Sequence, residues 1–382
     1  MAATPRFPEP LHVGRPNVGD RTRLFERLDG ALDRLVLTNS GPLSLEFEQR
    51  ISELTGAKHC IATVNATTGI QMAVRAAGIR AGQKVIVPSF TWVATAHALD
   101  WIGVVPVFCD ADPKSGTADP AHVEALIEPD TAGILAVHVF GYPCMVDALE
   151  KVADKYGLPL IFDAAHAFGS TYQGKPIGGF GAAEVFSFHA TKWINSFEGG
   201  AITTDDDELA VKLRGMRNLG LSVDHEHTWT GTAGRMNEAA AAMGLTSLEI
   251  MDELFAVNER NHRLYQEGLA GVPGVRVRPM APGERANHQY IVIEIDEAVS
   301  GVHRDRVHTE MFANNILTRR YFHPGCHQVE PYRSAPHVHA PQPLPRTEAL
   351  VEQVLALPNG MAIGPAEISG VCEVIAEVVD AA

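Results

Sequence analysis

Short apolar runs alternate with helical patterns along most of the first two thirds of the chain. The runs lie at 84–90, 104–110, 133–141, 158–165, 184–190 and 200–206. Amphipathic segments separate them, and one of these segments opens with Asp119-Pro120, a helix start signal. Near-continuous apolar strands separated by helices are typical of a parallel sheet covered on both faces. The pattern therefore predicts an α/β domain that extends to about residue 256.

The pattern changes in the last third of the chain. A long helical pattern at 235–269 leads into alternating strand and helix patterns of a second region. Strands are predicted at 275–279 and 290–296, and helices at 303–314, 346–357 and 365–379. We therefore expect a large, mostly parallel-sheet domain at 1–256, including the N-terminal segment, and a smaller C-terminal α+β domain at 257–382.

Composition and charge narrow the function classes. The formal net charge of -15 argues against nucleic acid as a partner, because phosphate backbones bind basic surfaces. The five cysteines are scattered and form no C-x-x-C pair, which is typical of reduced thiols in a cytosol. No apolar run reaches the ~20 residues that span a bilayer, and the N-terminus lacks the apolar core of a signal peptide. We expect a cytoplasmic protein with no membrane partner.

Polar residues at the ends of the predicted strands are the first candidates for a site, because ligands of open α/β sheets bind at the carboxyl ends of the strands. Asp163 ends one apolar run, and His166 follows it by three residues. Ser187 and Lys192 accompany the next run, and a helix is predicted to begin around Thr67. Taken singly, each has an ordinary explanation: a helix cap, a solvated lysine or a structural histidine.

Taken together, these residues point to a particular chemistry, although none of them does so alone. A lysine in a dry pocket can lose its proton and form a Schiff base, which is the chemistry open to Lys192. A carboxylate such as Asp163 can keep a pyridinium nitrogen protonated. Ser187 and the free amides at a helix N-terminus can bind a phosphate, and Trp92 can stack on a flat ring. These are the requirements of pyridoxal 5'-phosphate (PLP).

Motifs of competing chemistries are absent from the sequence. It contains no G-x-x-x-x-G-K-[ST] loop, no H-E-x-x-H and no G-x-S-x-G. The histidines at 323, 327, 337 and 339 lie in a proline-rich segment without regular ligand spacing. We therefore expect no metal site.

Several motifs occur in the order of a known family: "LTNSGPLSLEFEQ", "VIVPSFTWVATAHA", "VHVFGYP", "DAAHAFGS", "FSFHATK", "EGGAITT", "GRMNEAAAAMGL" and "RRYFHPGCH". The chain resembles the DegT/DnrJ/EryC1/StrS family of PLP-dependent sugar aminotransferases, which have the aspartate aminotransferase fold of type I. The resemblance covers nearly the whole chain.

The resemblance implies a role for each candidate residue. Lys192 would carry the Schiff base and shuttle protons, and Asp163 would pair with the pyridine nitrogen. His166 stands where the family commonly has glutamine, beside the ring hydroxyl. The phosphate would be held by Ser187 and by the amides around Ala66 and Thr67, and Trp92 would stack on the ring.

Two positions depart from the family pattern. Ala66 replaces a glycine at the phosphate-binding helix. Ala233 stands where the family typically has an asparagine that reaches the phosphate of the neighbouring subunit, so that contact is in doubt. Some relatives carry histidine at the Schiff-base position and act as dehydratases, but this chain has Lys192.

The resemblance thus implies a homodimer with shared active sites that transfers an amino group from L-glutamate to a nucleotide-linked keto sugar. Our best expectation is a dTDP-4-keto-6-deoxyhexose, in deoxyamino sugar or antibiotic biosynthesis. The alternatives are a cyclitol or aminoglycoside-precursor ketone as acceptor, and a non-catalytic PLP-binding or dehydratase relative. We expect Arg319, Arg320 and Tyr321 near the cleft, where a guanidinium can pair with a carboxylate or phosphate. The competing explanation for the two arginines is a surface basic pair.

Overall fold

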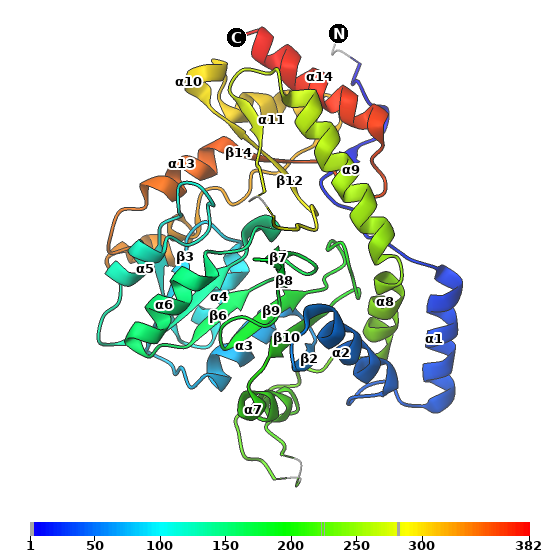
Figure 1. The fold of residues 1–382 in the computed structure, drawn as a ribbon, viewed down its shortest axis with the longest axis vertical. Helices are drawn as coiled ribbons and strands as arrows, with labels where there is room; N and C mark the ends of the chain where they lie inside the picture. Colours follow the sequence, from blue (N-terminus) through cyan, green and yellow to red (C-terminus); the bar gives the residue numbers. More distant parts are fainter. Residues whose placement is uncertain (1–3, 223, 225, 281–282) are drawn as a thin grey trace.

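A seven-stranded sheet forms the centre of the large part of the chain (Figure 1). The structure, a computed structural model, describes residues 4–222, 224, 226–280 and 283–382. The strands, in their spatial order, are β2 (His59–Thr63), β10 (Gly200–Thr204), β9 (Ala183–Ser187), β6 (Leu160–Asp163), β5 (Thr131–Val137), β3 (Lys84–Pro88) and β4 (Val105–Cys109). Each apolar run of the sequence thus contains a strand.

The sheet is parallel except at β10, which runs antiparallel to both of its neighbours. The connection from β9 to β10 contains no helix. Parallel neighbours need a crossover, usually helical, whereas antiparallel strands can be joined directly. The reversal of β10 follows from this short connection.

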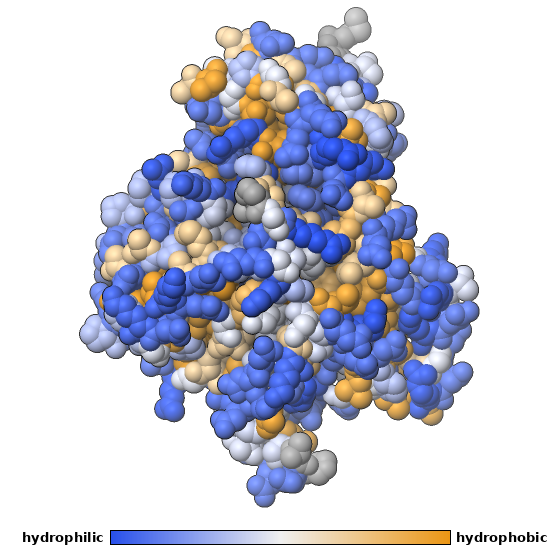
Figure 2. All heavy atoms as spheres, viewed as in Figure 1, coloured by the Kyte–Doolittle hydropathy of each residue, from blue (hydrophilic) through white to orange (hydrophobic). Residues whose placement is uncertain are grey.

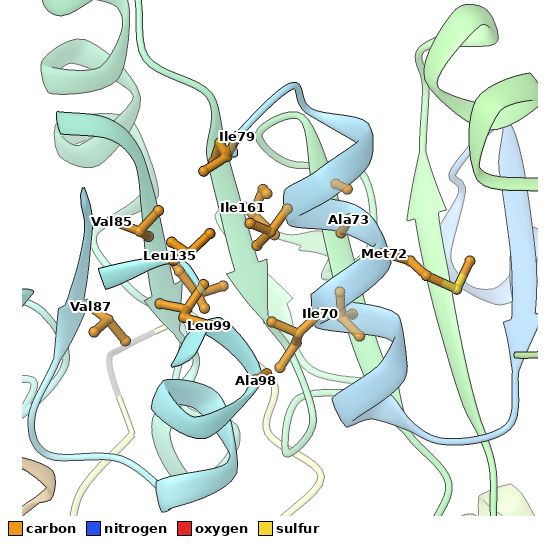
Figure 3. Packing of buried hydrophobic residues seen from close by; sticks show 14 of the residues in the cluster. Ile70, Met72, Ala73, Ile79, Val85, Val87, Ala98, Leu99, Leu135 and Ile161 are labelled. Carbon is orange, nitrogen blue, oxygen red and sulfur yellow. The ribbon is translucent and has the colours of Figure 1, made fainter. Parts of the chain in front are cut away.

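Helices cover both faces of the sheet, as the sequence predicts. One face packs against α3 (Ala66–Ala76), α4 (Val93–Trp101) and α7 (Asp207–Arg217). Figure 3 shows Ile70 and Ala73 of α3 beside Leu135 and Ile161 of the strands. The other face packs against α2 (Pro42–Thr55), α5 (Pro120–Ala125), α6 (Val146–Tyr156) and α8 (Glu238–Leu248). This two-sided burial explains why the strands are apolar at nearly every position.

The C-terminal region has an antiparallel sheet with the order β11-β12-β14. Its elements are α9 (Met251–Leu269), β11 (Val275–Val277), β12 (Ile291–Ile295), α10 (Glu297–Ser300), α11 (Arg304–Ala313), β13 (Ile316–Leu317), α12 (Pro336–His339), α13 (Pro345–Gln353), β14 (Val354–Leu357) and α14 (Pro365–Asp380). Helices α9, α11 and α14 pack on this sheet around an apolar core. The predicted fold class, a large α/β part with a smaller α+β part, is confirmed.

Two predicted helices have different bounds in the structure. The helix predicted at 346–357 ends at Gln353, and its last residues form β14 instead. The pattern at 235–269 is divided between α8 and α9, with Glu249 and Ile250 between them. The division of the chain at residue 256 stays a prediction, since α9 runs across that position.

The N-terminal segment reaches the C-terminal region. Strand β1 (Leu11–His12) pairs in parallel with β13, and α1 (Arg21–Arg34) then packs against α8. A short hairpin of β7 (Thr171–Tyr172) and β8 (Lys175–Pro176) completes the strands. Within the described ranges, none of the helices is long and apolar enough to cross a membrane.

Candidate functional site

A cavity of about 470 Å³ opens at the carboxyl ends of the central strands. This volume lies within the range of about 300–1,000 Å³ that is usual for small-molecule sites. Nine of the ten predicted site residues line it: Ala66, Thr67, Trp92, Asp163, His166, Ser187, Lys192, Arg319 and Tyr321. The tenth, Arg320, does not. The fold therefore brings together residues that are up to about 250 positions apart in the sequence.

Lys192 lies just beyond β9 in an irregular turn whose following residues are buried. Trp193 is 3% exposed and Ile194 is fully buried, so the chain is anchored directly after the lysine. The backbone N–H of Lys192 donates to the carbonyl of His189 at 2.8 Å. These contacts fix the backbone, so that the side chain enters the cavity. The apolar residues after Lys192 thus hold the amine in place.

The amine of Lys192 is held in an environment that favours its neutral form. Burial lowers the pKa of Lys192 from 10.5 to about 8, and the nearby Tyr321 and Asp163 offset only part of this effect. Nζ donates to the hydroxyl of Tyr290 at 3.3 Å. An amine with a pKa near 8 is about one tenth neutral at pH 7. Lys192 can therefore act as a nucleophile and exchange protons near neutral pH.

Asp163 is the last residue of β6, and each of its carboxylate oxygens accepts a hydrogen bond. Oδ1 accepts from the N–H of Ala165 at 3.0 Å, and Oδ2 accepts from the Thr95 hydroxyl at 2.8 Å. Burial raises the pKa of Asp163, and these two hydrogen bonds and the charge of Lys192 oppose the rise. The carboxylate is held rigidly at the cavity wall, where it can pair with a cationic ring nitrogen.

His166 presents a neutral imidazole to the cavity. Burial, and then the charge of Lys192, lowers its pKa well below 6.5. Its Nδ1 accepts from the backbone N–H of Phe140 at 3.3 Å, which assigns the proton of the neutral ring to Nε2. The ring lies 4.6 Å from that of Tyr290 and stacks on Phe322 at 6.3 Å. His166 can therefore donate a hydrogen bond from Nε2.

An anion-binding corner lies where α3 begins. Asn65 caps the helix by accepting from the N–H of Thr68 at 2.8 Å. The N–H groups of Ala66 and Thr67 belong to the first turn and have no partner within the helix. A Cβ at Gly200 would come within 2.6 Å of the Ala66 nitrogen, so only glycine lets β10 pass this close to the helix start. The corner suits a phosphate.

Ser187 completes the same side of the cavity. Its Oγ accepts from the N–H of His189 at 3.4 Å, which leaves the hydroxyl proton free to donate. Trp92 is 53% exposed, and its ring packs edge-on against Tyr321 at a centroid distance of 6.4 Å. A face of the Trp92 indole therefore remains open to a flat ligand, and the stacking role stays a prediction.

The two neighbouring arginines have different surroundings. Arg319 lines the cavity, whereas Arg320 donates to both carboxylate oxygens of Asp305 at 3.2 Å. Ala233 is exposed, is paired by a backbone bridge to Asn218, and does not line the cavity of its own chain. Its effect on a neighbouring subunit stays a prediction.

Sequence reasoning missed three residues at or beside the cavity. Tyr290 and Phe322 line it from the C-terminal region, and Thr95, in the first turn of α4, donates to Asp163 at the cavity wall. Thr95 could have been found from its place in "SFTWVAT", which follows a strand end, and Phe322 from its place directly after Tyr321 in "RRYFHPGCH". Tyr290 had no such signal.

Comparisons with known proteins identify the family of the chain. The model of the DegT/DnrJ/EryC1/StrS aminotransferase family matches residues 20–376. The chain is 38% identical to the GDP-perosamine synthase of Caulobacter vibrioides over 80% of this chain and 85% of that protein. It is 32% identical to the dTDP-4-amino-4,6-dideoxy-D-glucose transaminase of Escherichia coli over 91% of this chain and 93% of that protein.

A solved structure is still more similar. The crystal structure of DesI in the presence of its TDP-sugar product superposes with a TM-score of 0.94 at 50% identity, covering 99% of this chain and 95% of that one. Agreement over this length covers the sheet, the helices that flank it and the C-terminal region.

Proposed function

The chain belongs to the DegT/DnrJ/EryC1/StrS aminotransferase family and is a PLP-dependent aminotransferase, and we propose that it aminates a nucleotide-linked keto sugar at the expense of L-glutamate. The observation that carries the proposal is the pairing of Lys192 with Asp163 in one cavity of a chain whose relatives are named for nucleotide-linked amino sugars. Glutamate would leave as 2-oxoglutarate, and the sugar ketone would become an amine in a ping-pong cycle.

The cavity residues fit PLP. The N–H groups of Ala66 and Thr67 and the Ser187 hydroxyl would bind its phosphate, beside the close approach that Gly200 permits. The Asp163 carboxylate would hold the ring nitrogen, and the Nε2–H of His166 would donate to the ring hydroxyl. When bound, PLP supplies an electron-withdrawing ring that stabilises negative charge on the carbon next to the amine.

The protein's own groups perform the proton transfers and the positioning. Asp163 keeps a proton on the ring nitrogen, because a carboxylate favours a cation beside it. Lys192 would remove the proton from the amine-bearing carbon of the amino donor and return it to the carbon of PLP that receives the amine. A pKa of about 8 lets the same amine both accept and release a proton near neutral pH. Tyr290 accepts a hydrogen bond from the Lys192 amine and orients it. Phe322 and Tyr321 line the same cavity with aromatic surface that excludes water.

A dTDP-4-keto-6-deoxyhexose is the acceptor we propose. The Escherichia coli relative is named for a dTDP sugar with an amine on carbon 4, and DesI was solved with a TDP-sugar product. Transamination places an amine where a ketone stood, so such a product requires a ketone at carbon 4. The Caulobacter relative is named for a GDP sugar, so the nucleotide has to be tested separately from the sugar.

A half-reaction screen tests the function. PLP-loaded protein is first incubated with L-glutamate, and 2-oxoglutarate release is measured. The amino-loaded protein is then separated and offered dTDP-, UDP- and GDP-linked 4-keto sugars and a free cyclitol ketone, with mass spectrometry of the product. We expect amination of the dTDP-linked keto sugar. Amination of the cyclitol alone would reject the sugar assignment, and no 2-oxoglutarate release would reject glutamate as donor.

We also propose that the protein is a homodimer with shared active sites. Large apolar side chains are exposed on and around α1 and α2: Phe25, Leu32, Leu35, Leu37 and Leu45, each at least 51% exposed. Figure 2 shows such apolar atoms among hydrophilic ones over this side of the molecule. Exposed apolar patches mark interaction sites, and a second copy would cover this one. Phe197, 47% exposed and five residues after Lys192, would lie close to such an interface.

The dimer hypothesis makes Ala233→Asn informative. If the neighbouring subunit's loop faces the phosphate, the new amide adds a hydrogen bond to a charged group, about 1.5–3 kcal/mol. We expect PLP to bind about ten- to a hundredfold more tightly, measured by equilibrium dialysis, with Ala233→Ser as a smaller polar control. Unchanged or weaker binding would mean that another group already occupies that place. A fully active monomer would refute the shared site.

The lowered pKa of Lys192 predicts how PLP attachment depends on pH. Only the neutral amine can attack the PLP aldehyde, and Lys192 gains this form as pH rises through about 8. The rate of attachment to protein free of PLP should rise about tenfold per pH unit below 8 and level off above it, followed by visible absorbance. A rise that continues to pH 10 would place the lysine in water, with its ordinary pKa.

The cysteines indicate the compartment in which the protein works. All five cysteines are free and buried, as in proteins of a reducing compartment. We therefore propose a cytoplasmic enzyme, and a place in deoxyamino sugar and antibiotic biosynthesis follows from the acceptor.

A further inference from the structure

Residues 287–290, which lead into β12, contact both turns that carry catalytic groups. We name them the coupling segment; they are Asn287, His288, Gln289 and Tyr290. One of the two turns follows β6 and carries His166, and the other follows β9 and carries Lys192. The coupling segment belongs to the C-terminal region, so its contacts with the two turns join the C-terminal region to the catalytic groups of the large sheet.

Asn287 holds the turn that carries His166. Its side chain is fully buried, and its amide nitrogen donates to the carbonyl of His166 at 2.8 Å and to that of Phe168 at 3.0 Å. Its Oδ1 accepts from the N–H of Gln289 at 2.9 Å. A Cβ at Gly141 would come within 2.9 Å of the His166 carbonyl oxygen and 3.2 Å of this Oδ1, so glycine leaves room for the contact. Both amide hydrogens of Asn287 therefore fix the backbone from which the His166 ring enters the cavity.

Gln289 and Tyr290 hold the turn that carries Lys192. The amide nitrogen of Gln289 donates to the carbonyl of Thr191, the residue before Lys192, at 3.3 Å. The hydroxyl of Tyr290 accepts from Nζ of Lys192 at 3.3 Å. Burial raises the pKa of Tyr290 to about 12, so the hydroxyl keeps its proton near neutral pH. Two successive residues of the coupling segment thus contact the backbone just before the lysine and the amine itself.

Buried amides hold the coupling segment from its other side. The amide nitrogen of Asn258, on α9, donates to the carbonyl of Asn287 at 2.9 Å. The amide nitrogen of Asn359, just after β14, donates to the carbonyls of His288 at 2.6 Å and Gln289 at 3.2 Å. Both asparagines are buried, and a buried polar group that loses its partner is costly. The segment therefore cannot shift without breaking several buried hydrogen bonds.

The backbone of His288 shows how tightly the coupling segment is held. Its φ of +45° lies in the left-handed region, which is uncommon for a residue with a Cβ. Such conformations persist only where the surrounding structure imposes them, and they gather at functional sites. The His288 ring stacks on that of His262 at 4.1 Å, and burial lowers the pKa of both rings, that of His288 to about 3. The two rings therefore stay neutral near neutral pH.

We propose that Asn287 and Gln289 are positioning residues of the transamination, which fix His166 and Lys192 relative to each other through the coupling segment. Neither residue lines the cavity, so both act through the groups that do. Lys192 and His166 serve the same bound ring, and their spacing has to be kept during the proton transfer. A misplacement of about 1 Å in such a site can cost about 100-fold in rate. The inference does not depend on which ketone accepts the amine.

Three variants test the proposal. Asn287→Leu keeps the branched shape of the side chain and removes both of its donors. Gln289→Met keeps the size and removes the donor to the Thr191 carbonyl; the Oε1 of Gln289 has no hydrogen-bond partner among the described residues, so the change costs little else. The control is Ser300→Ala, which removes a buried hydroxyl that donates to the Asp296 carbonyl at 2.8 Å. Ser300 lies in the same C-terminal region and is not among the residues that line the cavity.

The pH dependence of PLP attachment to protein free of PLP gives the first readout, because it reports the pKa of Lys192. Burial is what lowers this pKa to about 8, so a looser turn that admits water should move it toward the ordinary 10.5. We expect this upward shift in Asn287→Leu and Gln289→Met, and none in Ser300→Ala. The titratable groups that face the amine are the same in all three variants: Asp163, His166, Tyr290 and Tyr321.

Kinetics of the PLP-loaded protein give the second readout. The single-turnover rate with L-glutamate should fall about 10- to 100-fold in Asn287→Leu and less in Gln289→Met, which removes one hydrogen bond. KM for glutamate should change little, because neither residue lines the cavity. A raised KM with an unchanged rate would mean that these residues act on substrate binding, and the inference would be wrong.

A purely structural role gives a different result. If Asn287→Leu and Gln289→Met lower Tm as Ser300→Ala does, but leave the rate and the pH dependence of PLP attachment unchanged, the coupling segment only stabilises the fold and the proposal fails. If Asn287→Leu does not fold, the same two measurements on Gln289→Met decide. PLP attachment is measured without substrate, so it tests the proposal even if the enzyme uses another amino donor or another ketone.

Discussion

Lys192→Ala should abolish the covalent attachment of PLP and lower the transamination rate by at least about 10²- to 10⁴-fold, the usual contribution of a positioned acid–base group. The structure gives the reason. Lys192 is the lysine among the cavity-lining residues, its pKa is lowered to about 8 by burial, and its Nζ is oriented by Tyr290. No other group that lines the described cavity combines an amine with this pKa. Water cannot replace it as a proton carrier at a fixed position.

The variant should fold normally and still bind PLP. The phosphate corner at Ala66 and Thr67 and the carboxylate of Asp163 remain in place, and burial of an amine is itself unfavourable. Three measurements check this: single-turnover rates, PLP retention in dialysis, and mass spectrometry after borohydride reduction, which should find no labelled lysine. Lys175→Ala, at an exposed position on β8, is the control. Near wild-type transamination by Lys192→Ala would overturn the central assignment.

Asp163→Asn should keep PLP bound but slow proton removal from the amino donor by orders of magnitude. An amide has nearly the shape of the carboxylate and can still accept from the Ala165 N–H, but it carries no charge to hold a proton on the ring nitrogen. Asp163→Glu should be intermediate, because it keeps the charge but displaces it. The measurement is the single-turnover rate with glutamate deuterated at the α carbon, which isolates the proton step.

Stability separates the catalytic role of Asp163 from a structural one. Its pKa is raised in the folded protein, chiefly by burial, so the ionised carboxylate destabilises the fold at pH values above its unfolded pKa. Asp163→Asn should therefore not lower Tm at pH 7. Asp119→Asn, at the N-cap of α5 and not among the residues that line the cavity, is the matched control. Asparagine can accept the same hydrogen bond from the Ala165 N–H, so an unchanged rate in Asp163→Asn would mean that Asp163 only holds this turn in place.

The sequence alone determined the large part of the fold and the chemical core of the site. Apolar runs of strand length, separated by amphipathic segments, allow few arrangements other than a covered parallel sheet. In such a sheet the carboxyl ends of the strands share one edge, so Asp163, at the end of one strand, and Lys192, shortly after the end of the next, had to come together. These conclusions depend on local patterns and one general rule of topology.

Only the tertiary structure decided the secondary structure of residues 354–357 and the direction of β10. Residues 354–357 continue a helical pattern, yet they form β14, because pairing with β12 buries Leu355 against Ile293. Helical propensity of a few tenths of a kcal/mol per residue is smaller than the burial of such side chains. The reversal of β10 likewise depends on the absence of a helix before it.

The same limit applies to the site. Arg319 and Arg320 are neighbours in the sequence, and only the fold shows that Arg320 pairs with Asp305 of α11 whereas Arg319 lines the cavity that contains Lys192. Tyr290 contacts Lys192 from nearly a hundred residues away, and the N-terminal segment reaches the Lys192 turn through Asn17. Contacts between distant segments are set by how the whole chain packs, because no spacing in the sequence encodes them. The lysine and its carboxylate could be predicted from the sequence, whereas the surroundings that tune and extend their site could not.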